Sequence, residues 1–235
     1  MRRNFIFIAP ILLVLCWAGN MVAQDSTSNP PKQPPRRSPA AAKAAEAEGQ
    51  DFLFQKHDVK NAIESFKKTV ELDPWYAHGY IMLGVAYMQA QSWDHAQWAF
   101  EEAAKVDPDD HQACLGVGSA LNEQKSYEAA QKALTHCLEL KPDSAEAHYE
   151  LARTLWSLQK LQPAEAEARR AIELNKEYVN PHVLMGNIYL AQSDPDGALA
   201  EFREALRLEP EGPEAAEVKD IIARIQKALT HTAQN

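Results

Sequence analysis

The sequence has no motif that would mark a catalytic or cofactor-binding site. It contains no His-Glu-x-x-His pair, no phosphate-binding loop and no nucleophile elbow. Gly116 and Gly118 resemble a fragment of a dinucleotide-binding loop, but they lie inside a predicted helix with no strand before it. We therefore expect a protein that is not an enzyme and that holds no cofactor and no metal.

Positive charge is scarce beyond residue 40. Five of the 24 Lys and Arg residues precede that position, but only one of the 33 Asp and Glu residues does, which leaves 19 − 32 = −13 for the rest. A surface of this sign repels phosphate backbones. We therefore exclude nucleic acid as a partner and expect a protein or peptide that is basic or amphipathic.

The N-terminus has the order of parts of a secretory signal peptide. Arg2 and Arg3 precede an uncharged apolar run from Phe5 to Trp17, and small residues follow up to Ala23. We predict that residues 1–23 are removed and that the protein is exported, to the periplasm or outside the cell. The alternative is an uncleaved segment that anchors the chain in the inner membrane, since ~20 apolar residues span a bilayer. Contact with the membrane is expected only in that second case.

The next segment, residues 24–40, lacks aromatic and large apolar side chains, and five of its residues are prolines. Such a stretch cannot bury a core. It is therefore predicted to be a disordered spacer between the export signal and a folded domain.

A period of 34 residues runs through the rest of the chain. One column of the period holds the alanines Ala62, Ala96, Ala130, Ala164 and Ala198. A second holds the prolines Pro74, Pro108, Pro142 and Pro210. A third holds the small residues Gly84, Gly118, Ala152 and Gly186, and a fourth holds Phe66, Phe100, Leu134 and Phe202, broken by Ala168. Four columns in one register indicate an internal repeat.

This pattern resembles the tetratricopeptide repeat, whose 34-residue unit is two antiparallel helices. The unit over 77–110 carries the full signature in Tyr80, Leu83, Gly84, Tyr87, Ala96, Phe100, Ala103 and Pro108. The resemblance implies an all-α, right-handed superhelical solenoid of antiparallel helix pairs that ends in a capping helix. Its expected parts are a divergent first repeat at 41–76, four repeats at 77–110, 111–144, 145–178 and 179–212, and the cap at 213–230.

The resemblance also implies that the first helix of each repeat lines a concave groove, where the ligands of the family bind. Positions two, five, nine, twelve and thirteen of each repeat share that face. The predicted partner-binding residues are His78, Ile81, Val85, Met88, Leu115, Ser119, Asn122, Tyr149, Arg153, Trp156, Val183, Asn187 and Leu190. Most of the larger ones are apolar or aromatic, which is typical of a binding surface. The alternative is that neighbouring repeats pack over some of them.

The leading hypothesis is a scaffold or adaptor of the cell envelope that holds a peptide segment of a partner in this groove. The alternative is a structural subunit of a secretion, pilus or outer-membrane complex that uses convex or terminal surfaces. The clamp with which chaperone-binding members of the family grip a C-terminal carboxylate is missing. The matching positions hold Glu46, Gln50, Met82, Gln112 and Gly116.

Two cysteines, Cys114 and Cys137, remain after removal of the predicted signal peptide, in a compartment where disulfides persist. They lie at similar distances on either side of the central turn of one repeat, so antiparallel helices bring them to nearly the same height. In the family both positions face the core. They are a candidate disulfide, and the alternative is two separate buried thiols, because a bridge needs Cα atoms within ~7 Å.

Two histidines, His148 and His182, share the fourth position of their repeats. In the family this position holds a large core residue. Neighbouring helices pack ~8 to 10 Å apart, which is too far for both imidazoles to hold one metal easily. We therefore predict two core histidines and no metal site.

Overall fold

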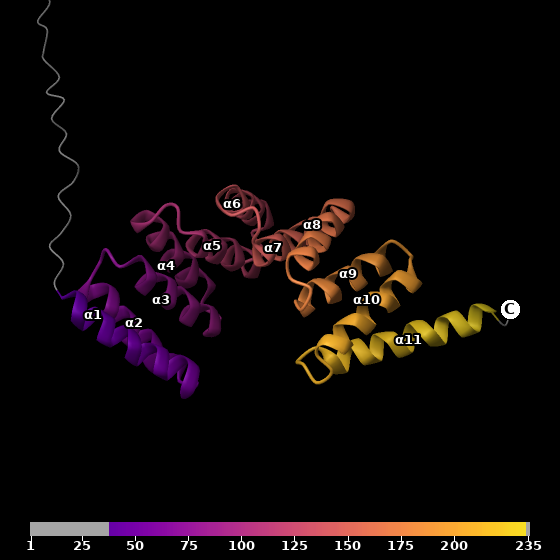
Figure 1. The fold of residues 1–235 in the computed structure, drawn as a ribbon, viewed down its shortest axis with the longest axis horizontal. Coiled ribbons are helices and arrows are strands. Elements are labelled where there is room, and N and C mark those ends of the chain that lie inside the picture. The colour runs from indigo at the N-terminus through magenta and orange to yellow at the C-terminus, as the bar shows by residue number, and fades with distance from the viewer. Residues whose placement is uncertain (1–37, 234–235) are drawn as a thin grey trace, which may run out of the picture. The chain divides into compact units, whose positions relative to one another are not determined.

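The computed structural model describes residues 38–233, and the side chains of residues 38–230. Within this range the chain forms eleven α-helices and one π-helical turn, η1, with no strand (Figure 1). The elements are α1 Pro39–Gln50, η1 Asp51–Gln55, α2 Val59–Leu72, α3 Ala77–Gln89, α4 Trp93–Val106, α5 His111–Glu123, α6 Tyr127–Leu140, α7 Ala145–Ser157, α8 Leu161–Leu174, α9 Val179–Ala191, α10 Pro195–Leu208 and α11 Ala215–Ala233. The predicted all-α solenoid of helix pairs is confirmed.

The predicted signal peptide, residues 1–23, and most of the predicted spacer lie outside the described residues. The spacer was predicted to end at residue 40, but α1 already begins at Pro39. Ser38 caps the first helix by accepting a hydrogen bond from the backbone N–H of Ala41 (3.4 Å), and Pro39 is the first residue of α1. Proline suits this position because its missing N–H would have no partner in the first turn of a helix.

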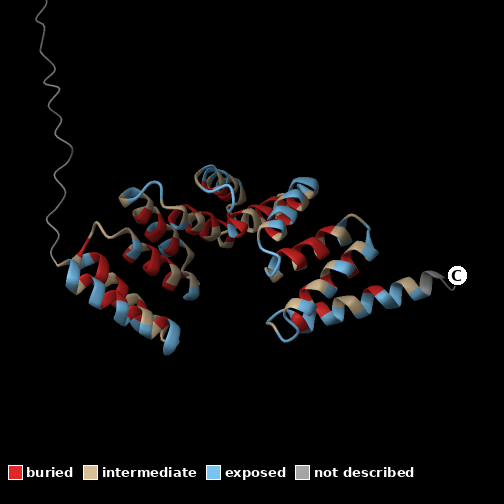
Figure 2. Cartoon of the chain, viewed as in Figure 1, coloured by how far each residue is buried: buried red, intermediate tan, exposed pale blue. Residues whose placement is uncertain are grey.

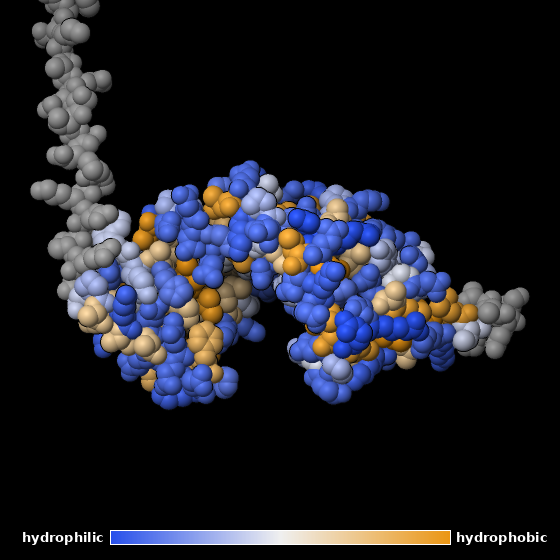
Figure 3. Space-filling model, in the orientation of Figure 1, coloured by the Kyte–Doolittle hydropathy of each residue, from blue (hydrophilic) through white to orange (hydrophobic). Residues whose placement is uncertain are grey.

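Each helix contacts the next along the chain, and the odd-numbered helices α1, α3, α5, α7 and α9 also contact one another in succession. The odd-numbered helices therefore form one continuous row, on which the predicted groove lies. Buried residues lie mainly on the helix faces turned toward neighbouring helices, and exposed residues lie on the outer faces (Figure 2). The face drawn in Figure 3 is mostly hydrophilic, with apolar side chains in scattered patches.

The turn inside each helix pair has the same backbone conformation. One residue per pair adopts a left-handed conformation, with φ between 54° and 63°, two residues before the second helix begins. These residues are His57, Gln91, Lys125, Gln159 and Ser193, at intervals of 34. None is glycine, although a left-handed conformation is unfavourable for residues with a Cβ atom.

The first helix pair differs from the others by one residue. Gly49 precedes Ala62 by thirteen residues, whereas Gly84 precedes Ala96 by twelve. The extra residue is absorbed in η1, because a π-helical turn holds one residue more than an α-helical turn. The first repeat is therefore divergent in its turn and not in its helix packing.

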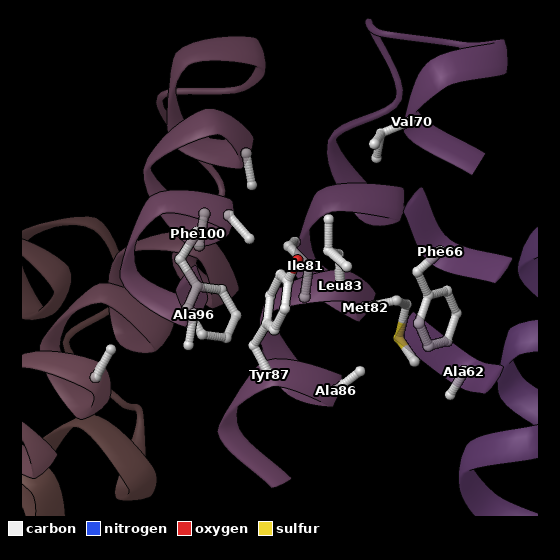
Figure 4. Packing of buried hydrophobic residues seen from close by; sticks show 14 of the residues in the cluster. Ala62, Phe66, Val70, Ile81, Met82, Leu83, Ala86, Tyr87, Ala96 and Phe100 are labelled. Carbon is white, nitrogen blue, oxygen red and sulfur yellow. The ribbon is translucent and has the colours of Figure 1, made fainter. Parts of the chain in front are cut away.

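The glycines of the first helices make room for large side chains of the second helices. A Cβ atom added at Gly84 would lie 2.7 Å from Phe100, and one added at Gly186 would lie 2.6 Å from Phe202. Such contacts are too close to exist, so these positions require glycine. Phe66 and Phe100 lie on either side of the α3 side chains around Leu83 (Figure 4).

The fourth helix pair replaces both members of this contact. Ala152 and Ala168 stand at the positions of Gly84 and Phe100, sixteen residues apart in each case, and both are fully buried. The methyl group of Ala152 replaces the glycine hydrogen, and the space for it exists because Ala168 is much smaller than phenylalanine. Ala152 and Ala168 are the exceptions in their two sequence columns, and each compensates for the other.

The structure joins α5 and α6 by a disulfide between Cys114 and Cys137, whose Cα atoms are 5.5 Å apart. Both residues are buried in the third helix pair. The sulfur atoms lie 3.2 Å and 3.3 Å from the carbonyl oxygen of His111. The covalent link therefore fixes the first turn of α5 against the last turn of α6.

Candidate functional site

The structure sorts the predicted groove residues by exposure. His78 and Leu190 are exposed. Val85, Met88, Leu115, Ser119, Tyr149, Arg153, Trp156, Val183 and Asn187 are half-buried. Ile81 and Asn122 are buried, each only 5% exposed, and are therefore not available to a partner.

Ile81 and Asn122 are buried for different reasons. Ile81 belongs to the hydrophobic core that the first helix pairs share, and Figure 4 shows it among the core side chains of α3. Asn122 belongs to a polar network: its amide donates to the backbone oxygen of Glu150 (3.1 Å), and the hydroxyl of Thr154 donates to its side-chain oxygen (2.7 Å). The prediction that these two residues line the groove was wrong.

Five of the predicted groove residues come together in one hollow between α7 and α9, which we call the α7/α9 pocket. Its volume is about 190 Å³. It is lined by Tyr149, Arg153, Trp156 and Ser157 of α7, by Asn180, Val183, Leu184 and Asn187 of α9, and by Glu214, which precedes α11. The pocket thus combines aromatic and aliphatic walls with amide, hydroxyl and carboxylate groups.

Tyr149 is held in the wall of this pocket by its neighbours. Its ring packs edge-on against that of Tyr178, with the centroids 5.2 Å apart, and the guanidinium carbon of Arg153 lies 5.9 Å from its centroid. Burial raises the pKa of Tyr149 to about 12. The phenol is therefore neutral at physiological pH and can donate a hydrogen bond.

Arg153 carries a charge that is already paired. It donates to Glu123 on α5 (2.7 Å) and to Glu150 one turn earlier on α7 (2.9 Å). Burial alone would lower the pKa of Arg153, but the two carboxylates outweigh it and raise the pKa. Arg153 therefore fixes α7 to α5 and does not offer a free cation to a partner.

Glu214 could not be predicted from the repeat pattern, because it lies between the last repeat and the final helix. Its side chain is exposed at the rim of the α7/α9 pocket. It lines the same hollow as Tyr149 and Trp156. Within residues 38–230 no Lys or Arg forms an ion pair with it.

The other end of the row of odd-numbered helices holds a buried carboxylate. Glu46 is 7% exposed and accepts a hydrogen bond from the hydroxyl of Tyr76 (2.7 Å). Its second oxygen lies 3.4 Å from Nε2 of His78, a distance long for a hydrogen bond. Burial and this carboxylate together raise the pKa of Tyr76 to about 12. His78, a predicted groove residue, therefore stands against α1.

The two histidines at the fourth repeat position each pair with a glutamate on the second helix of their own pair. Nδ1 of His148 lies 2.6 Å from Glu167, and Nδ1 of His182 lies 2.7 Å from Glu201. His148 also places Nε2 3.1 Å from the carbonyl oxygen of Pro142. These contacts hold the two helices of a pair together, and neither histidine lines the α7/α9 pocket.

Comparison with protein families now identifies the repeat. One model described as a tetratricopeptide repeat matches residues 121–188, and a second with the same description matches residues 81–135 and 183–229. Together they span residues 81–229. The chain belongs to the tetratricopeptide-repeat family.

Solved structures of tetratricopeptide-repeat type resemble the chain in fold. MamA from Desulfovibrio magneticus RS-1 is 20% identical with a TM-score of 0.63, over 74% of this chain and 98% of that one. PilF of Pseudomonas aeruginosa is 20% identical with a TM-score of 0.64, over 82% and 91%. YrrB, described as having an unusual peptide-binding site, is 20% identical with a TM-score of 0.55, over 77% and 98%.

No curated protein matches this tetratricopeptide-repeat chain. None of the helices described between residues 38 and 233 is long and apolar enough to cross a membrane. The solved structures are too distant in sequence to transfer a ligand or a partner.

Proposed function

We propose that the protein is a non-enzymatic scaffold or adaptor that binds a peptide segment of a partner protein in the α7/α9 pocket. One observation carries this proposal: residues chosen from the repeat pattern alone, among them Tyr149, Trp156, Val183 and Asn187, line a single hollow. Partly exposed aromatic side chains are typical of binding hot spots. The amides supply hydrogen bonds that a peptide backbone can use.

The cell envelope is the proposed location of this scaffold. Residues 1–23 have the parts of a signal peptide, and an oxidising compartment suits the disulfide between Cys114 and Cys137. N-terminal sequencing of the mature protein, together with cell fractionation, tests this location. Cleavage after Ala23 supports export, an intact N-terminus in the membrane fraction supports the anchored alternative, and a cytosolic protein that keeps its N-terminus contradicts both.

An alternative function rests on a different observation. Phe54 and Trp98 are large apolar residues that are 50% and 45% exposed, and neither belongs to the predicted groove. They favour a structural subunit that makes fixed contacts through surfaces other than the groove. Trp98 is also a useful control, because it is an exposed tryptophan outside the α7/α9 pocket.

A pull-down from envelope extract separates these two functions. The bait proteins are the wild type, the Tyr149→Ala/Trp156→Ala variant and the Trp98→Ala variant, each checked by circular dichroism. The proposed function requires a partner that the wild type and Trp98→Ala both retain and that the double variant loses. A partner that is lost only with Trp98→Ala supports the structural alternative and contradicts the proposal.

A further inference from the structure

The α7/α9 pocket adjoins a second, smaller hollow of about 90 Å³ between α9, α10 and α11, which we call the α9/α11 slot. The two share Asn180, Val183 and Glu214 as lining residues. The slot adds the aliphatic side chains of Leu206 and Val218. Apolar side chains therefore lie on both sides of Val183: Tyr149 and Trp156 in the pocket, and Leu206 and Val218 in the slot.

The charges around these two hollows do not balance. Glu209 and Glu214 line the slot, and no Lys or Arg in the described part of the chain forms an ion pair with either. Two nearby cations are already paired: Arg153 with Glu123 and Glu150, and Lys219 with Glu211. The surface thus offers apolar walls next to carboxylates that lack a cation.

A long basic side chain has the complementary chemistry. Lysine and arginine carry an apolar stem that packs along apolar surface and a charged end that stays near water. An aromatic ring such as that of Trp156 attracts a cation placed over its face. A carboxylic or wholly apolar side chain would leave Glu214 repelled or without a partner.

We propose that the α7/α9 pocket binds one lysine or arginine side chain of the partner peptide, with the stem against Trp156 and the cation at Glu214. This inference rests on the proposed function and names the chemistry of its ligand. It explains why Arg153 is neutralised by two carboxylates: a free cation in that wall would repel the incoming one.

A peptide library tests the choice of side chain. Phage carrying random nonapeptides are selected on the full mature chain, on Glu214→Gln and on Glu217→Gln, an exposed carboxylate of α11 outside both hollows. We expect the wild type and Glu217→Gln to enrich peptides with one fixed lysine or arginine, and Glu214→Gln to lose that preference. Enriched peptides without a fixed basic residue overturn the inference.

A titration then measures the pairing directly. The probe is the most enriched wild-type peptide and its copy with the basic residue changed to methionine. Glu214→Gln should weaken binding of the basic peptide about fivefold, the size expected of an exposed ion pair, and leave binding of the methionine peptide unchanged. An equal loss for both peptides contradicts the pairing.

The tests distinguish the failure of this inference from failure of the proposed function. If enriched peptides bind the wild type and lose binding with Trp156→Ala, the pocket is the binding site whatever side chain it holds. If that variant binds them as tightly as the wild type does, the proposed function fails and the inference falls with it.

Discussion

The second and fourth helix pairs follow the same 34-residue repeat, but their large side chains occupy different positions of it. In the second pair Phe100 fills the core beside Gly84, and Ile81 is buried at the fifth position. In the fourth pair the position of Phe100 holds Ala168, and the fifth position holds Tyr149, which lines the α7/α9 pocket.

This difference shows how one repeat pattern can place a large side chain either in the core or in the wall of a pocket. The twelfth position is Met88 in the second pair and Trp156 in the fourth. Both pack partly against core residues, but Trp156 also lines the pocket. The second pair thus has the aromatic ring of Phe100 between its helices. The fourth pair lacks that ring and instead has Tyr149 and Trp156 on the face of the row of odd-numbered helices. The column of small residues, which includes Gly84 and Ala152, fixes how the helices pack. The fifth and twelfth positions determine which side chains the row of odd-numbered helices exposes.

The largest expected effect concerns the core of the second pair. Phe100→Ala should lower the free energy of unfolding by about 3 to 5 kcal/mol, because the ring leaves a cavity between α3, α4 and α5. Phe54→Ala is the matched control, since that ring is half exposed and should cost less than about 0.5 kcal/mol. Urea unfolding of both variants measures the difference, and equal stability would show that Phe100 does not support the second pair.

A smaller effect is expected when the second pair is made more like the fourth. Gly84→Ala should destabilise the wild type by about 1 to 3 kcal/mol, because the new methyl group would collide with the ring of Phe100. In the Phe100→Ala background the same change should cost nothing, as with Ala152 beside Ala168. A double-mutant cycle by chemical unfolding measures this coupling. Additive effects would mean that the two positions do not share one contact.

The fourth repeat position should make the fourth pair sensitive to pH, unlike the second, where it holds Tyr80. The hydrogen bond to Glu167 raises the pKa of His148, while burial opposes the rise. Because the folded-state pKa lies above the unfolded value, the stabilisation is complete below about pH 6.5 and is lost as pH rises through the folded pKa.

Melting temperatures of the wild type and His148→Gln from pH 6 to pH 9 test this sign. The stability advantage of the wild type should shrink as pH rises. His111, whose pKa is lowered by burial, has the opposite pH dependence, but it is present in both proteins and cancels in the difference. An advantage that grows with pH would contradict the account of His148.

The smallest effect should be the same in both pairs. Gln91→Gly and Gln159→Gly relieve a left-handed conformation at equivalent turns and should each raise stability by up to about 1 kcal/mol, the gain being reduced by the greater freedom of glycine in the unfolded chain. Thermal melts of the two variants measure it. A gain in one pair and a loss in the other would show that the pairs do not share their turn.

Much of the fold could be predicted because its signals lie inside one period. Small residues at fixed intervals identified the helix pairs, and the one-residue offset of Gly49 pointed to a divergent first repeat. The residue that contacts each glycine could not be predicted from the sequence: the structure shows that it is Phe100 or its equivalent, and not the alanine. Two columns lie on the second helix, and their spacing alone does not say which one faces the first helix.

Less of the candidate site could be predicted, because it depends on contacts between repeats. Helical periodicity placed Tyr149 and Trp156 on the face that carries the α7/α9 pocket, but it could not tell them from Ile81, which neighbouring helices bury. The ion pair of Arg153 with Glu123 joins α7 to α5, and the sequence of a single repeat does not indicate it. Glu214 lies outside the repeats altogether, where no period applies.

The central claim is that the partner peptide binds in the α7/α9 pocket, and not on the exposed surface around Trp98 of α4. Its most direct test is calorimetric titration of a library-selected peptide into the wild type, Trp156→Ala and Trp98→Ala, because both substitutions remove one partly exposed tryptophan. We predict that Trp156→Ala weakens binding by about 2 kcal/mol, or roughly thirtyfold, and that Trp98→Ala leaves it unchanged. Undiminished binding by Trp156→Ala, or an equal loss in both variants, would contradict the claim.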